Sequence, residues 1–240
     1  MLTRPNADNS SHPTMRPHIW ERMLRFWEAD RGLSIVLALL VAIIFVLPPL
    51  LAPDSTGRLV ADLAFSALLI AGAFTAAESR RVRFVVVAFT AATLLVRWAA
   101  AASPSDALAI GREASNLAML LLFAMVVAAR AYRPGPVTHH RIQGAVAVLL
   151  LLGLVWANAY ELLYLIHPDA FSGAVGNAPG APTWIYYSFV TLTTMGYGDI
   201  TPVHPIARSL AISEALSGQL YIAVTLARLM ALHVSASGKN

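Results

Sequence analysis

The chain has 240 residues, of which 58% are hydrophobic and only 12% charged, and its mean hydropathy is +0.64. A soluble domain carries far more charge, so this composition excludes a water-soluble globular protein and indicates a membrane protein. The absence of cysteine excludes disulfides and thiolate metal sites. Because the net charge is only +4, the placement of the charges says more than their sum.

Residues 1–30 begin as a polar stretch and end as an amphipathic one. Ile19, Trp20, Met23, Leu24 and Trp27 share one helical face. A segment of this kind before a first membrane span is typical of a helix that lies in the headgroup plane. We therefore expect a cytoplasmic N-terminal segment with an interfacial helix; a simple polar extension is the alternative.

Six stretches have the length and apolar character of membrane-spanning helices, which predicts an all-α membrane protein. They are residues 33–52, 59–77, 84–102, 107–129, 142–160 and 206–234. A Pro-Gly-Pro run within 134–141 cannot continue a helix and marks a linker. The sequence thus predicts a four-span N-terminal domain (31–133), a two-helix pore domain (142–234) and a short cytoplasmic tail (235–240).

The basic residues predict how the chain crosses the membrane. Most lie in segments on the same side as the N-terminus: Arg4, Arg16, Arg22, Arg25, Arg31, Arg80, Arg81, Arg83, Arg130, Arg133, Arg141, Arg228 and Lys239. Positive charge is enriched on the cytoplasmic side of membrane proteins. We therefore expect a multi-pass protein of the cell (inner) membrane with both termini in the cytoplasm and the 161–205 connection outside.

That outer connection contains a segment too short to span a bilayer. A helix over 183–193 is about 16 Å long, roughly half a membrane, so it is expected to be re-entrant and buried in protein or facing water. We take Thr183 as its N-cap. The C-terminal end of this helix carries the negative pole of its dipole, which favours a cation near the membrane centre.

The five residues after this helix are Thr194, Met195, Gly196, Tyr197 and Gly198. A row of backbone carbonyls that face one axis can replace the water around a cation. Successive carbonyls face the same axis only if the backbone alternates between two conformations, one of which most residues resist. Gly196 and Gly198 allow positive φ without a steric cost. Thr194 adds a hydroxyl at the inner end, and Met195 and Tyr197 are expected to pack outward against the pore helix.

The run from Thr191 to Asp199 resembles the signature of tetrameric potassium channels, whose filter carbonyls replace the hydration shell of K⁺. The resemblance covers about 90 residues and is to the bacterial six-span type without voltage-sensor arginines. It implies K⁺ sites at Thr194, Met195, Gly196 and Tyr197, with K⁺ as the transported ion and no cofactor. One filter segment per chain implies a homotetramer in the lipid bilayer, with no nucleic-acid partner.

The resemblance also implies a set of supporting residues next to the filter. Thr193 precedes it, and Asp199 follows it. Tyr186 and Tyr187 occupy positions where family members often have Trp-Trp, and the first of that pair often hydrogen-bonds to the acid after the filter. Many members have Val in place of Met195, which puts filter stability in doubt.

Two residues of the last span, Glu214 and Gly218, are expected to lie near the middle of the membrane. Gly218 resembles the family's gating-hinge glycine, and the alternative is a glycine that allows close helix packing. Ionisable residues at the depth of Glu214 are costly and rarely incidental. Glu214 is expected either to hydrogen-bond behind the pore helix or to shape the ion field or the gate.

The four leading spans lack the row of arginines that a voltage sensor needs. Arg112 is adjacent to Glu113 near the outer start of the fourth span, and the outer ends also collect Asp62 and Arg97. We therefore expect an ion-pair cluster there and weak dependence of opening on voltage.

The sequence as a whole predicts a passive, K⁺-selective channel. An enzyme is not expected, because catalytic acids, histidines and nucleophiles do not converge at one depth. A weakly selective cation channel and a non-conducting regulatory subunit are the alternatives.

Overall fold

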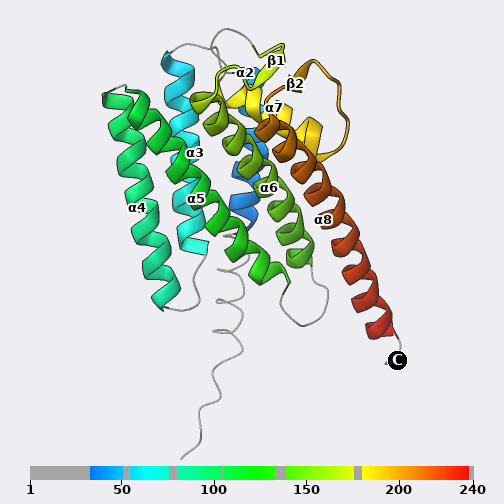
Figure 1. The fold of residues 1–240 in the computed structure, drawn as a ribbon. Helices are drawn as coiled ribbons and strands as arrows, with labels where there is room; N and C mark the ends of the chain where they lie inside the picture. The colour runs from blue at the N-terminus through cyan, green and yellow to red at the C-terminus, as the bar shows by residue number, and fades with distance from the viewer. Residues whose placement is uncertain are drawn as a thin grey trace, which may run out of the picture.

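The computed structural model of the chain describes residues 33–50, 55–75, 80–103, 105–132, 139–175 and 180–237. The predicted interfacial helix before residue 31 lies outside this part of the chain. The described residues form a bundle of long helices that run alongside one another, with two short strands at one end (Figure 1).

The first described helix, Leu33–Leu50, contains a π-helical turn (η1, Ala42–Val46) and a last turn, α2 (Leu47–Leu50). It is followed by α3 (Ser55–Thr75), α4 (Arg80–Ala102), α5 (Asp106–Ala131), α6 (His139–Ile166), α7 (Ala181–Leu192) and α8 (Pro205–Ser237). Strands β1 (Phe171–Gly173) and β2 (Ile200–Pro202) pair antiparallel, with Ser172 opposite Thr201.

Among the described residues, five helices are long and apolar enough to cross a membrane: Leu33–Leu50, Phe84–Ala102, Asp106–Ala131, Ile142–Ile166 and Pro205–Arg228. These match five of the six predicted spans. The apolar part of α3 is shorter, Leu59–Ala73, so a span there stays a prediction. Two boundaries differ from expectation: α6 begins inside the predicted linker, and α8 continues into the predicted tail.

The π-helical turn in the first helix has a local cause. Pro48 and Pro49 have no N–H to donate to the carbonyls one turn earlier, so the regular ladder cannot continue through them. The N–H of Leu47 instead reaches back five residues to the carbonyl of Ala42. A π turn is a common way for a helix to absorb such an interruption.

The main hydrophobic core joins the front helices to α6. It includes Leu40 of the first helix, Leu68 of α3, Phe123 of α5 and Leu151 of α6, each at most 1% exposed. Burying side chains of this size is worth about 1.5–3 kcal/mol each. This core fixes α6 against the first helix, α3 and α5, and α6 in turn packs against α7 and α8.

The predicted ion-pair cluster is confirmed. Arg97 of α4 pairs with Asp62 of α3, and Arg112 pairs with Glu113, its neighbour on α5, at 2.6 Å. Glu113 also accepts a 2.5 Å hydrogen bond from Nδ2 of Asn158 on α6. Arg97 therefore links α4 to α3, and Glu113 links α5 to α6.

Helices α6 and α8 differ sharply in how much of their surface the chain itself covers. The chain buries 61% of the most apolar window of α6 but only 11% of that of α8. Helix α8 stands at the edge of the bundle in Figure 1, and Ile212, Leu216 and Leu220 on it are exposed. A single chain therefore leaves a large apolar helix face without a protein neighbour.

Candidate functional site

Helix α7 begins two residues earlier than expected. Gly180 is its N-cap and Pro182 lies in its first turn, so the assignment of Thr183 as the N-cap was wrong. Proline suits a first turn because its missing N–H would have no helical partner there. At 12 residues the helix is about 18 Å long, shorter than the helices around it.

One face of α7 is held by an aromatic cluster. Trp184 and Tyr187 are buried, and the ring of Tyr187 lies 4.8 Å from that of Tyr160 on α6 and 5.4 Å from that of Phe171 on β1. Tyr187 therefore supports the site by packing. Aromatic pairs of this kind add about 0.5–1.5 kcal/mol each beyond the area that they bury.

The backbone after α7 alternates in conformation. Thr194, Gly196 and Gly198 have positive φ angles of 59°, 58° and 79°. The two glycines can adopt positive φ angles because they have no Cβ. Thr194 was not anticipated, because a β-branched residue in this region costs about 1–3 kcal/mol and occurs only where its surroundings impose it.

Backbone hydrogen bonds to the last turn of α7 impose this conformation. The N–H of Thr194 donates to the carbonyl of Thr191 at 2.9 Å, and that of Met195 donates to the carbonyl of Val190 at 2.9 Å. The N–H of Gly196 reaches the same Val190 oxygen at 3.3 Å. The side chain of Thr193 also returns to α7, donating to the carbonyl of Phe189 at 2.6 Å.

The carbonyls of this segment have no such partners. Within the described part of the chain, no hydrogen bond ends on the carbonyl oxygen of Thr194, Met195, Gly196 or Tyr197. Backbone carbonyls are strong acceptors, so four consecutive carbonyl oxygens without a protein donor require either water or a cation as a partner. The Thr194 hydroxyl accepts a 3.4 Å contact from the amide of Gln219 on α8.

Hydrogen bonds hold the Asp199 end of the segment on two sides. Tyr186 donates a 2.7 Å hydrogen bond to Asp199, as the resemblance implied. This bond raises the pKa of the Tyr186 hydroxyl, which keeps it a donor. On the other side, the N–H of Ala174 donates to the carbonyl of Asp199 at 2.7 Å, beside the two-stranded sheet. The sequence did not predict this sheet.

Met195 and Tyr197 do not pack as expected within one chain. Their exposed fractions are 63% and 67%, so helix α7 of the same chain does not cover them. All residues from Thr193 to Asp199 are exposed, between the buried Leu192 and Ile200.

Glu214 joins three helices behind this segment. Its side chain is fully buried, and Tyr160 of α6 donates to its Oε2 at 2.5 Å. Its Oε1 lies 2.5 Å from the hydroxyl of Ser188 on α7, and that hydroxyl lies 2.8 Å from the carbonyl of Gly153 on α6. This geometry agrees with the first alternative for Glu214, hydrogen bonding behind the pore helix. Tyr160 and Ser188 were missed because nothing in their local sequence marks them as partners of a residue on α8.

Gly218 lies against the end of α7. A Cβ built on it would be 2.3 Å from the carbonyl oxygen of Leu192. Backbone cannot yield to such a contact as a flexible side chain can, and α8 runs through Gly218 without a break. The structure therefore supports the close-packing alternative, and a hinge at Gly218 stays a prediction.

The region that contains this segment is similar to known proteins. Residues 148–234, which run from within α6 to near the end of α8, match the family model described as an ion channel. A two pore potassium channel c from Oryza sativa subsp. japonica is 36% identical over 63 residues, which is 26% of this chain and 14% of that protein. The chain thus spans about one seventh of that relative's length. The likeness is therefore to ion channels, and it is confined to the C-terminal part of the chain.

We predict that Gly218→Ala lowers stability, because its new methyl group collides with the end of α7. Gly111→Ala is the matched control, since the nearest atom to its Cβ is a Val96 methyl at 3.9 Å, and it is expected to be neutral or to stabilise by up to about 1 kcal/mol. Thermal unfolding in detergent measures both. Equal melting temperatures for Gly218→Ala and the unmodified protein would favour the hinge over close packing.

We predict that Glu214→Gln is tolerated and Glu214→Leu is not. A glutamine amide donates to Ser188 and accepts from Tyr160, so the three helices stay linked. Leucine leaves the Tyr160 hydroxyl buried without an acceptor, at a cost of about 1–3 kcal/mol. Melting temperatures and size-exclusion profiles distinguish the two variants. An equal drop in melting temperature in both would show that the hydrogen bonds to Glu214 do not determine the stability of the helix bundle.

Proposed function

We propose that the chain is a subunit of a K⁺-selective channel in which residues 194–198 form the selectivity filter. The observation that carries the proposal is the row of four unbonded carbonyls on a backbone that alternates in sign of φ. A dehydrated cation is the partner that such a row fits, because it replaces several water oxygens at once. The likeness to a potassium channel supports K⁺ as that cation.

The surroundings of the segment favour a cation as well. The C-terminal end of α7 leads directly into Thr194, so the negative end of its dipole faces the inner end of the filter. Asp199 at the outer end adds a carboxylate held by Tyr186. The pathway is passive, since ions are only exchanged between successive oxygen sites.

We further propose that four chains assemble around the filter. One segment supplies a quarter of a closed ring, and homo-oligomers favour closed symmetry. The exposure of Met195, Tyr197 and one face of α8 supports the proposal, because neighbouring copies would cover them. In this arrangement Met195 and Tyr197 pack against the pore helix of a neighbouring subunit instead of the pore helix of their own chain.

The proposed orientation places both termini in the cytoplasm and the two strands outside. Helix α7, both strands and the start of α8 lie toward one end of the bundle in Figure 1, opposite the C-terminal end of α8. The arginine-rich segments predicted to be cytoplasmic then share the side of the C-terminus. The front four spans would form the periphery of the tetramer in the cell membrane.

Reversal potentials in liposomes that contain the purified full chain test the function. With K⁺ on one side and Na⁺ on the other, the potential should follow the K⁺ gradient. Equal permeability to both ions would identify a weakly selective cation channel, and absence of current would identify a non-conducting subunit. Native mass spectrometry of the same sample should give a tetramer.

We predict that Gly196→Ala forms folded tetramers that conduct poorly or without selectivity. Its φ of +58° is strained for a residue with a Cβ, by about 1–2 kcal/mol in each subunit. Within the described residues, and apart from its two chain neighbours, no atom lies within 4 Å of an added Cβ. The loss therefore comes from backbone conformation and not from a collision. Reversal potentials compared with those of Gly111→Ala measure it; normal K⁺ selectivity in Gly196→Ala would place the filter elsewhere.

We predict shallow voltage dependence. One charge that crosses the whole field contributes about 2.3 kcal/mol per 100 mV, and steep gating uses three or four per subunit. Arg97 of α4 and Arg112 of α5, both near the predicted outer ends of their helices, are paired with Asp62 and Glu113. Single-channel recording between about −100 and +100 mV tests this. An effective gating charge near twelve per channel would overturn it.

A further inference from the structure

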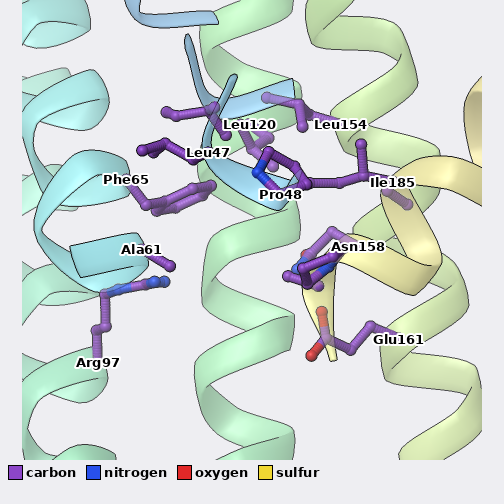
Figure 2. Close-up of a pocket in the computed structure, with 14 residues that line it drawn as sticks. Leu47, Pro48, Ala61, Phe65, Arg97, Leu120, Leu154, Asn158, Glu161 and Ile185 are labelled. Carbon is purple, nitrogen blue, oxygen red and sulfur yellow. The ribbon is translucent and has the colours of Figure 1, made fainter. Parts of the chain in front are cut away.

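A cavity of about 100 Å³ lies between the front helices and the start of α7. Most of its wall is apolar, with Leu47, Phe65 and Leu120 on the front side and Leu154 and Ile185 on the pore side. Figure 2 shows that Arg97 enters the cavity from one side and that Asn158 and Glu161 enter from the other. The polar groups thus gather toward one end of a largely apolar space.

Two buried polar atoms at that end have no partner. Arg97 bonds Asp62 through Nη2, but its Nε–H makes no hydrogen bond to any described residue. Asn158 donates to Glu113 through Nδ2, but its Oδ1 accepts no hydrogen bond from the described part of the chain. Both residues are only 8% exposed. The cavity therefore presents one unused donor and one unused acceptor, with the Glu161 carboxyl on the same side as Asn158. Buried polar groups in proteins are normally hydrogen-bonded, so an occupant is expected.

The chemistry of these atoms selects the head group of the occupant. The Arg97 Nε–H requires an acceptor, and Asn158 Oδ1 requires a donor. A carboxylate cannot donate, and an alkylammonium, which stays protonated at neutral pH, cannot accept. A hydroxyl does both.

The walls and the volume select the body of the occupant. Water has about 30 Å³ per molecule in the liquid, so the cavity has room for about three. Waters along the apolar wall, however, would lack the two to four polar partners that a buried water needs. A short hydrocarbon chain fits that part of the space.

We propose that this cavity binds a small amphiphile with one hydroxyl group, such as a short-chain alcohol. The hydroxyl lies between Arg97 and Asn158, and the hydrocarbon lies against Phe65 and Ile185. Because Pro182 and Ile185 of α7 form part of the wall, the occupant touches the helix that leads into Thr194. Occupancy thereby changes conduction, a consequence that rests on the proposed channel function.

Photolabelling of the full chain in detergent tests the binding. The probe is a butanol that carries a diazirine on its carbon chain, and adducts are mapped by mass spectrometry. We expect adducts on Leu47, Phe65 or Ile185 that 1-butanol prevents. Butyrate and butylammonium should compete at least about tenfold more weakly, because each loses a hydrogen bond that the alcohol makes. Equal competition by all three, or adducts only on lipid-facing residues, would overturn the proposal and leave water as the occupant.

A variant that fills the cavity provides an independent check. Ala61→Leu places extra volume in the wall, whereas Ala67→Leu, on the same helix, adds it on an exposed position away from the cavity. Labelling should be lost in the first variant and kept in the second; equal labelling would contradict the site. If Ala61→Leu does not fold, the competition by butanol, butyrate and butylammonium is by itself the test of the proposed site.

Potassium flux in liposomes tests the link to conduction separately. Flux should respond to 1-butanol in the unmodified protein and in Ala67→Leu but not in Ala61→Leu. An equal response in both variants would show that the alcohol acts elsewhere. Absence of flux in every protein would contradict the channel function and leave the labelling result standing.

Discussion

The carbonyl oxygens of residues 194–197 impose the main physical constraint on this structure. They have no hydrogen-bond partner within the described chain. Carbonyl groups that lack a partner favour a helix or a strand, in which backbone N–H groups would bond to them. The segment keeps its form because the N–H groups of Thr194, Met195 and Gly196 are all taken by the last turn of α7. The donors are thus satisfied on one side, while the acceptors remain available on the other.

This arrangement works only if α7 itself does not move. Glu214 links α7 to α6 and α8 through Ser188 and Tyr160, and Gly218 lets α8 approach the final carbonyl of the helix. At the outer end, Tyr186 and the sheet next to Ala174 hold Asp199. The inner and outer ends of the segment are therefore fixed by different elements, and α6 connects both to the front helices.

The sequence predicted the features that depend on local pattern. Long apolar runs predicted the spans, and alternate glycines predicted positive φ at Gly196 and Gly198. It did not predict the features that depend on contacts between distant residues. The positive φ of Thr194, the pairing of Ser172 with Thr201 and the bond from Tyr160 to Glu214 each arise from tertiary structure. Chain composition also could not show that Met195 and Tyr197 would be left uncovered within a single chain.

The central claim is that carbonyls from several copies of the chain surround a row of dehydrated cations. Anomalous scattering from Rb⁺, an electron-rich substitute for K⁺, in crystals of the assembled protein tests this most directly. The account predicts peaks in line on a fourfold axis, level with the carbonyls of Thr194, Met195, Gly196 and Tyr197. Crystals grown in Rb⁺ in which these carbonyls point away from any symmetry axis, or in which the axis carries no peak between them, would contradict it.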